Sequence, residues 1–425
     1  MGRLSGTTHL TKPKFIDLFA GCGGLSLGLL SAGWQGVFAV EKNGDAFATL
    51  KANLIGRRKL RFSWPDWLPQ EPTTTSALIS EFSDHLTKLR GQIDLIAGGP
   101  PCQGYSFAGK RDAKDPRNKL KDEYIQLVEI VRPKYLLFEN VRGFSSSFDG
   151  VGGDVHADVI QEQLEGFSWG GYHVFSKVVN ASMFGVPQPR PRFILLAARR
   201  DLSLDLEVKD PFNKLAEFAS GFRNSRGLNG HEITVKEAIS DIEIVECGVA
   251  ESKETPGFKE IDYSPPMSPT PFQKLMRKGM LNRSIPNSLR LARHRPSTLL
   301  RFNDILMNCP KGTTLSKDFR DHYNMKKQCF TPLHPNQMSK TITTLPDDLL
   351  HYSEPRFLTV RENARIQSFP DWFEFHGKYT TGGSRRKDEC PRYTQVGNAV
   401  PPLMAEALGS LVISEFHDHW SIAPK

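Results

Sequence analysis

The sequence lacks the features that mark membrane and secreted proteins. Its 425 residues contain no apolar run near the ~18 residues that a membrane-spanning helix needs. The first 15 residues also lack the apolar core of a secretory signal peptide. We find no internal repeat and no low-complexity tract. We therefore expect a globular protein of the cytoplasm that does not associate with a membrane.

Cysteine is scarce, and no pair of cysteines has the spacing of a metal site. The chain has 6 cysteines and no C-x-x-C pair. Neither a disulfide framework nor a zinc site is expected, and we predict no metal. A reducing compartment fits this pattern, and a cysteine with a special role is then more often a nucleophile.

Acidic residues are missing from one long segment. Residues 263–301 contain no Asp or Glu but 8 basic residues, which equals the net charge of +8 of the whole chain. A solvated surface normally mixes both signs, and here apolar residues are interleaved with the basic ones. We interpret the segment as a phosphate-contacting surface, with a plain solvated face as the alternative. The basic residues are Lys274, Arg277, Lys278, Arg283, Arg290, Arg293, Arg295 and Arg301.

The first half of the chain alternates short apolar strands with helical stretches. The pattern predicts strands at 15–18, 37–40, 93–97, 135–138 and 193–197. It predicts helices at 25–32 and 124–131, and a last helix at 403–416. Such alternation indicates an α/β fold with a mostly parallel, doubly wound, Rossmann-like sheet.

The regular pattern fades near residue 200 and returns near Arg356. We predict a cofactor-binding and catalytic domain at 1–200 and a smaller, irregular target-recognition domain at 201–355. Residues 356–425 would then close the recognition domain and return the C-terminal helix to the catalytic domain.

A glycine-rich loop follows the first predicted strand. Residues 17–24, Asp-Leu-Phe-Ala-Gly-Cys-Gly-Gly, let the backbone approach a ligand at the start of a helix. Glu41 ends the second strand, 18 residues after Gly23, where an acid commonly binds the ribose hydroxyls of a nucleoside cofactor. Ser26 occupies the third glycine position of the full motif. The loop fits NAD or S-adenosylmethionine, and a purely structural turn is the alternative.

A second loop, residues 98–104, reads Gly-Gly-Pro-Pro-Cys-Gln-Gly and follows the third predicted strand. Ligands bind at the carboxyl edge of a doubly wound sheet, so we expect Cys102 to point into a cleft. Most cysteines are small buried hydrophobic residues, and we assign that role to the other five.

These residues resemble the motifs of DNA cytosine-5 methyltransferases. Residues 98–103 are similar to the catalytic loop of that family, and residues 17–24 to its cofactor loop. Phe138 to Val141 resembles the Glu-Asn-Val segment, and residues 188–192 resemble the Gln-x-Arg-x-Arg motif. Residues 361–370 and 397–401 match the last two motifs in family order. The set brackets residues 15–409, nearly the whole chain.

The resemblance implies a reaction and the residues that perform it. Cys102 would add to C6 of a flipped cytosine, so that C5 can accept a methyl group. Glu139 would stabilise the ring at N3. Arg190 and Arg192 would hold the cytosine O2 or anchor Cys102 and Glu139. The sequence does not identify the base that removes the C5 proton.

The resemblance also implies S-adenosylmethionine as cofactor and double-stranded DNA as partner. The acid that usually contacts the adenine amino group is not matched: residues 71–76 offer threonines, and Asp66 is a substitute. Residues 103–118 would form a mobile lid over the flipped base. The predicted cofactor residues are Phe19, Gly21, Gly23, Glu41, Gly98, Pro100, Asn398 and Val400. The predicted DNA-binding residues are Gln103, Ser106, Lys110, Arg111, Arg290, Arg293 and Arg295.

Several alternatives stay open at this point. The leading interpretation is a monomeric bacterial modification enzyme, with a possible cognate restriction endonuclease acting separately. The same chemistry on tRNA is a second reading, although the long basic insert favours duplex DNA. A nicotinamide oxidoreductase gives no role to Cys102 or Glu139. A catalytically silent DNA-binding relative is disfavoured because Cys102, Glu139 and Arg192 are all present. No code links residues to bases, so the recognition sequence and the methylated cytosine are not predicted.

Overall fold

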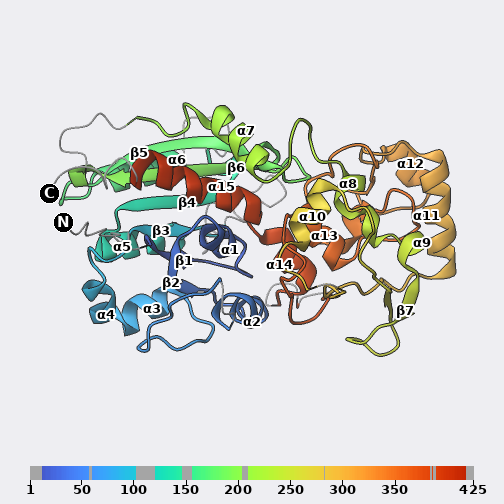
Figure 1. Ribbon diagram of the computed structural model, residues 1–425, viewed down its shortest axis with the longest axis horizontal. Coiled ribbons are helices and arrows are strands. Elements are labelled where there is room, and N and C mark those ends of the chain that lie inside the picture. Colours follow the sequence, from blue (N-terminus) through green and yellow to red (C-terminus); the bar gives the residue numbers. More distant parts are fainter. Residues whose placement is uncertain are drawn as a thin grey trace, which may run out of the picture.

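The computed structural model describes residues 12–56, 60–101, 120–145, 156–202, 209–281, 283–382, 385 and 389–417. They form two lobes that lie side by side (Figure 1). One lobe is built on a large sheet, and the other consists of short helices and small strands.

The sheet has six strands in the order β2-β1-β3-β4-β6-β5. The strands β1 to β4 pair in parallel, whereas β6 runs antiparallel to β4 and β5 antiparallel to β6. This confirms the α/β class. The strands are β1 (Lys14–Leu18), β2 (Gln35–Val40), β3 (Leu95–Gly98), β4 (Tyr135–Val141), β5 (Tyr172–Asn180) and β6 (Pro191–Arg199).

The sequence analysis missed β5 and did not predict the direction of β6. β5 is an edge strand in which three consecutive residues, Ser176 to Val178, are exposed, so its apolar signal is broken. β6 covers the predicted strand at 193–197. The connection at 181–190, which contains a short 3-10 helix (Ala181–Phe184), reverses the chain and sets β6 antiparallel to β5.

Helices cover both faces of the sheet. On one face α3, α4, α5 and α6 pack against strand residues such as Ile16, Ile96 and Phe138. On the other face α1, α7 and α15 pack against alternate strand residues such as Phe15 and Leu137. The helices of this lobe are α1 (Gly24–Ser31), α2 (Gly44–Leu50), α3 (Thr75–Glu81), α4 (Ser83–Lys88), α5 (Leu120–Val131), α6 (His156–Glu165), α7 (Leu215–Ser225) and α15 (Pro402–Val412).

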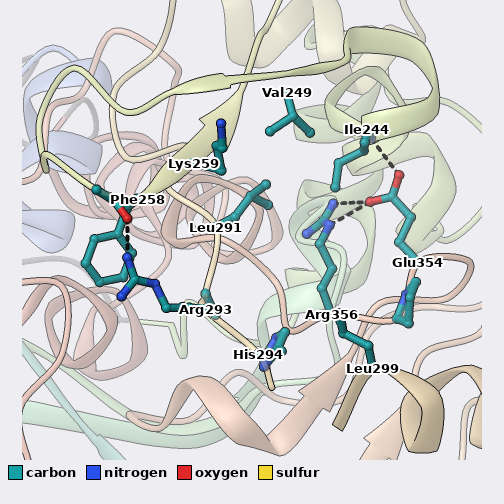
Figure 2. A pocket seen from close by; sticks show the side chains of 13 residues that line it. Ile244, Val249, Phe258, Lys259, Leu291, Arg293, His294, Leu299, Glu354 and Arg356 are labelled. Carbon is teal, nitrogen blue, oxygen red and sulfur yellow. Dashed lines mark hydrogen bonds and ion pairs between the residues drawn. The ribbon is translucent and has the colours of Figure 1, made fainter. Parts of the chain in front are cut away.

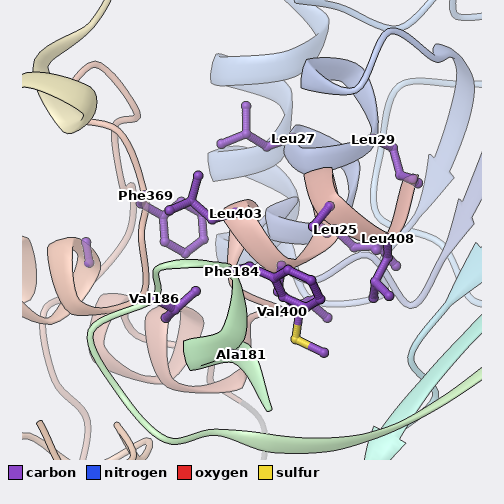
Figure 3. Close-up of a cluster of buried hydrophobic side chains, with 14 of the residues drawn as sticks. Leu25, Leu27, Leu29, Ala181, Phe184, Val186, Phe369, Val400, Leu403 and Leu408 are labelled. Carbon is purple, nitrogen blue, oxygen red and sulfur yellow. The ribbon is translucent and has the colours of Figure 1, made fainter. Parts of the chain in front are cut away.

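The C-terminal helix α15 is part of the core (Figure 3). It packs against α1, where a Cβ on Gly28 would lie 2.6 Å from the Pro402 carbonyl oxygen. Within the described residues, one helical stretch, Arg392–Phe416, is long and apolar enough to cross a membrane, but 67% of its most apolar window is buried. Its burial identifies it as a core element.

The second lobe holds the remaining elements. They are α8 (Val235–Ile239), α9 (Ile244–Cys247), α10 (Pro271–Arg277), α11 (Pro296–Asn308), α12 (Lys317–His322), α13 (Val360–Ile366), α14 (Arg392–Asn398), β7 (Val249–Glu251), β8 (Lys259–Ile261), β9 (Thr331–Pro332) and β10 (Leu349–Leu350). The predicted boundary at residue 200 falls before α7. That helix packs on the sheet lobe, where Arg226, just after it, forms an ion pair with Glu406 of α15.

Candidate active site

The carboxyl ends of three neighbouring strands bring the predicted site residues together. The register aligns Leu18 of β1 with Gly98 of β3, and Gly98 with Phe138 of β4. The loops that follow these residues therefore meet at one edge of the sheet. A Cβ on Gly99 would lie 2.9 Å from Glu139 Oε2, so a side chain at this position would displace the Glu139 carboxyl group.

Glu139 is an acid of this edge whose side chain is 12% exposed. The Arg192 guanidinium, which projects from β6, donates from Nε to Glu139 Oε1 at 2.8 Å. Burial raises the pKa of Glu139, and the positive charges of Arg192 and Arg190 oppose that rise. The neighbouring Asn140 donates from Nδ2 to the Pro100 carbonyl at 3.3 Å and so ties β4 to the loop that precedes Cys102.

Arg190 has different partners from Arg192, although the two belong to one motif. Its guanidinium is buried and donates to the carbonyl oxygens of Ile342 at 2.9 Å and Gly397 at 2.6 Å. Burial lowers the pKa of Arg190 well below its usual range. The structure therefore makes Arg190 a link between the sheet and the second lobe, whereas Arg192 is the arginine that anchors Glu139.

Gln188 extends this link. Its Nε2 donates to the Ile366 carbonyl at 3.0 Å and to Gln367 Oε1 at 2.8 Å, and its Oε1 accepts from the Ile342 amide at 2.9 Å. The sequence motif gave no role to this glutamine.

The predicted residues Cys102, Gln103, Ser106, Lys110 and Arg111 lie outside the described residues. The described chain reaches Pro101, which is exposed.

Of the other five cysteines, Cys329 is exposed. The expectation that all five are buried is therefore wrong for Cys329.

The glycine loop has the geometry of a ligand cradle. Phe19 (φ 59°), Gly21 (φ 58°) and Gly23 (φ 96°) adopt left-handed backbone conformations. A Cβ at Gly21 would meet no atom within 4 Å, so the backbone there is open to a ligand. Glu41 lies beside the loop and accepts from the Gly21 amide at 2.9 Å and from the Asn43 amide at 2.7 Å. Burial raises the pKa of Glu41.

The end of the chain closes this cradle. Val400 is buried, and its carbonyl oxygen lies so near Gly24 that a Cβ there would overlap it. Asn398 is exposed at the end of α14. The segment 71–76 also lies close, because the Thr73 amide donates to the Glu41 carbonyl at 2.9 Å. Asp66 is exposed. The structure thus gathers Phe19, Gly21, Gly23, Glu41, Gly98, Pro100, Asn398 and Val400 around one edge.

Asp17 is a buried acid near the end of β1, just before the loop, and the sequence pattern did not single it out. Ser26, which occupies the third glycine position, donates from its hydroxyl to Asp17. Burial raises the pKa of Asp17 to about 7. The serine at position 26, where the full motif has glycine, could have indicated this acid. A hydroxyl at the start of a buried helix needs a hydrogen-bond acceptor.

The predicted phosphate contacts differ in exposure. The Arg290 guanidinium lies between the rings of Phe258 and Tyr379, at 4.3 and 3.8 Å from their centroids. Arg293 also lies over the Phe258 ring, 4.9 Å from its centroid, and lines a cavity of about 340 Å³ in the second lobe (Figure 2). Arg293 and Arg295 are exposed. Arg290 is thus a packing residue, whereas Arg295 is free to meet a phosphate.

No group of three or more His, Cys, Asp or Glu residues that could hold a metal ion occurs within the described ranges.

Comparison with known proteins identifies the family. The model of the C-5 cytosine-specific DNA methylases matches residues 13–414. The chain belongs to this family. It is therefore a DNA cytosine-5 methyltransferase, and the oxidoreductase alternative is wrong.

The relatives of the methyltransferase cover almost all of it. The Type II methyltransferase M.DdeI of Desulfomicrobium norvegicum is 31% identical over 94% of this chain and 88% of its own length. M.XorII of Xanthomonas oryzae pv. oryzae is 30% identical over 95% and 85% of the two chains. A crystal structure of a DNA modification methyltransferase encoded within an Escherichia coli prophage matches with a TM-score of 0.63 at 24% identity, over 96% of this chain and 100% of that one. This last likeness shows the fold.

Proposed function

We propose that this methyltransferase transfers a methyl group from S-adenosylmethionine to C5 of a cytosine within a specific double-stranded DNA sequence. We further propose that it is the modification enzyme of a Type II restriction–modification system, because M.DdeI and M.XorII are Type II methyltransferases. A cognate endonuclease would act as a separate protein. The methyltransferase would work as a monomer in the cytoplasm.

The observation that carries this proposal is the Glu139–Arg192 pair at the carboxyl edge of the sheet, 2.8 Å apart and beside the loop that leads to Cys102. Burial raises the pKa of this carboxyl group and so favours the protonated form, which could donate to N3 of cytosine, while Arg192 opposes the rise. Arg192 fixes the orientation of that carboxyl group. N3 is where charge collects when a nucleophile adds at C6.

Cys102 would supply the nucleophile. Its thiolate adds to C6, and the electron pair of the C5–C6 double bond becomes available at C5 for the methyl group. A base then removes the proton from C5, and the C6–S bond breaks to restore the aromatic ring and the thiolate. The attack needs access above and below the ring, so the cytosine must leave the helix.

S-adenosylmethionine would supply the methyl group as a sulfonium electrophile, and its methyl–sulfur bond would break to leave a neutral thioether. The residues present fit it, since Gly21 leaves the backbone open and Glu41 offers a carboxylate to two ribose hydroxyls. Gly98 and Pro100 would place the bound cofactor next to Cys102. The pocket would be completed by Phe19, Gly23, Asn398 and Val400.

The positive charge of Arg295 and of the lid residues Lys110 and Arg111 would hold the DNA backbone.

Bisulfite sequencing of plasmid DNA from expressing cells tests the proposal. The wild type should methylate one cytosine of a fixed sequence and form a denaturation-resistant adduct with DNA that contains 5-fluorocytosine. Cys102→Ser should lose both, and Glu139→Gln should lower the rate ~10²–10⁴-fold with cofactor affinity nearly unchanged. Substantial turnover by the serine variant would contradict the role of Cys102. Methylation of tRNA instead of plasmid DNA would favour the RNA alternative.

A further inference from the structure

Two apolar side chains project from the basic segment of the second lobe. Leu281 is 79% exposed and Ile285 is 51% exposed, just after α10. We propose that Leu281 and Ile285 form an apolar wedge that enters the DNA duplex between base pairs while the protein is bound. This inference rests on the proposed function in DNA modification and adds a contact that the reaction chemistry does not require.

The charges around the wedge favour a polyanion as its partner. Lys274, Lys278 and Arg283 are all exposed. Within the described part of the chain, no acidic side chain pairs with any of the three. By contrast, Arg277 in the same segment contacts Tyr263 and Asp371. An apolar tip between unpaired cations suits a duplex, whose phosphates flank a stack of apolar base faces.

The backbone on either side of the wedge is firmly held. Gly279 adopts a left-handed conformation (φ 92°) against the Trp372 ring, where a Cβ would lie 3.4 Å from the ring. Just before it, the Met276 carbonyl accepts from the Asp371 amide at 2.8 Å. Arg283 also has a positive φ of 69°. The contacts of Met276 and Gly279 tie the segment that precedes the wedge to the segment at 371–372.

The far side is held by a buried arginine. Arg361 is fully buried and donates to the Asn287 carbonyl at 3.0 Å and to Asn287 Oδ1 at 2.9 Å. A side chain that must unstack bases needs such a rigid base, because a mobile loop would yield before the DNA did.

The wedge also lies near the junction of the two lobes. Asn287 donates to the Phe375 carbonyl at 3.0 Å, and the adjoining Glu374 carbonyl accepts from Asn53 of the sheet lobe at 2.7 Å. Figure 1 shows α10 on the side of the second lobe that faces the sheet. A duplex bound between the lobes would therefore pass the wedge.

The decisive measurement separates apolar insertion from charge attraction. Binding of a duplex carrying the cytosine identified by bisulfite sequencing is measured over a salt series for Leu281→Ala, Lys278→Ala and the control Leu300→Ala. Leu300 is the same residue type, is 72% exposed and lies on α11, away from the basic tips. Circular dichroism and thermal unfolding verify that each variant is folded.

Leu281→Ala should weaken binding by about ten-fold at every salt concentration, because an apolar contact releases no counterions. Lys278→Ala should instead make the slope of log affinity against log salt shallower by roughly 0.9. Leu300→Ala should change neither quantity.

Unchanged affinity of a folded Leu281→Ala protein would overturn the proposal. So would a shift in oligomeric state at unchanged DNA affinity, which would make the patch a contact between protein copies. Neither result would touch the proposed function, which stands or falls on whether the wild type methylates DNA.

Discussion

At the scale of single residues, the site is shaped by acids that the fold removes from water. Asp17 accepts from Ser26, faces the like charge of Glu41, and has its pKa raised to about 7, chiefly by burial. Such an acid is protonated in much of the folded population at neutral pH. The interior of the cofactor loop therefore carries less negative charge than the sequence suggests.

Asp17→Asn should stabilise the protein at pH 8. The ordinary pKa of 3.8 rises to about 7 on folding, so the unfolded chain releases this proton first as pH rises. The free energy of unfolding therefore falls between about pH 4 and pH 7, by up to about 4 kcal/mol. Asparagine accepts the same hydrogen bond without this loss. Urea unfolding at pH 5 and pH 8 measures the difference.

The exposed Asp66→Asn serves as the control and should change the free energy of unfolding by less than about 0.5 kcal/mol. A pH dependence of Asp17→Asn equal to that of the wild type would show that Asp17 is ionised in the folded protein throughout.

At the scale of elements, two helices from opposite ends of the chain build the floor of the cofactor cradle. Helices α1 and α15 approach closely because each has a glycine, which lacks a side chain, at their contact. A Cβ on Gly28 would lie 2.5 Å from the Glu406 amide nitrogen, and a Cβ on Gly409 would lie 2.9 Å from Leu29. The close approach places Val400 against the loop at Gly24.

Gly28→Ala should therefore separate α1 from α15. The obstructing atoms are the Cβ of Ala405 and two backbone atoms, and none of them can rotate away, so we expect a loss of about 1–3 kcal/mol in the free energy of unfolding. Affinity for S-adenosylmethionine should fall as well, because Val400 moves with α15. Thermal unfolding and calorimetry measure the two effects.

Gly221→Ala in α7 is the matched control, because its Cβ would meet no atom within 4 Å. That change should stabilise the protein by about 0.4–1 kcal/mol. If the two alanine variants behaved alike, close packing of α1 on α15 would not limit stability.

At the scale of the whole molecule, one short motif joins the two lobes. Gln188 and Arg190 reach backbone groups of the second lobe and of the C-terminal segment, while Arg192, two residues on, turns to Glu139. The connection between the lobes is thus continuous with β6, the strand that carries Arg192.

Arg190→Met should loosen this junction. It removes two hydrogen bonds from a charged donor and leaves the carbonyls of Ile342 and Gly397 without that donor, at a cost of about 3 kcal/mol. We expect calorimetric unfolding to broaden or split as the lobes uncouple. The exposed Arg295→Met should shift stability by less than about 0.5 kcal/mol. A single, unshifted transition in Arg190→Met would contradict the role of Arg190 as a link.

The sequence by itself determined the local features of this methyltransferase. Apolar runs followed by glycine predicted β1 and the cofactor loop, and the ordered motifs predicted Glu139, Arg192 and Glu41 as neighbours of one site. The structure confirms the strand and the turn, because strand formation and tight turns depend on adjacent residues. It also pairs Glu139 with Arg192, whereas the roles of Glu139, Arg192 and Glu41 in one site stay predictions.

Only the tertiary structure decided which chemically similar residues share a role. Arg190 and Arg192 stand two apart in the chain, yet one reaches Gly397 and the other Glu139. Arg290 looks like its neighbours but is enclosed by Phe258 and Tyr379, which lie 32 and 89 residues away in the sequence. The edge strand β5, the burial of Asp17 and the close packing of α15 on α1 also depend on distant partners. Their physical basis is packing and desolvation between segments that the linear pattern does not place side by side.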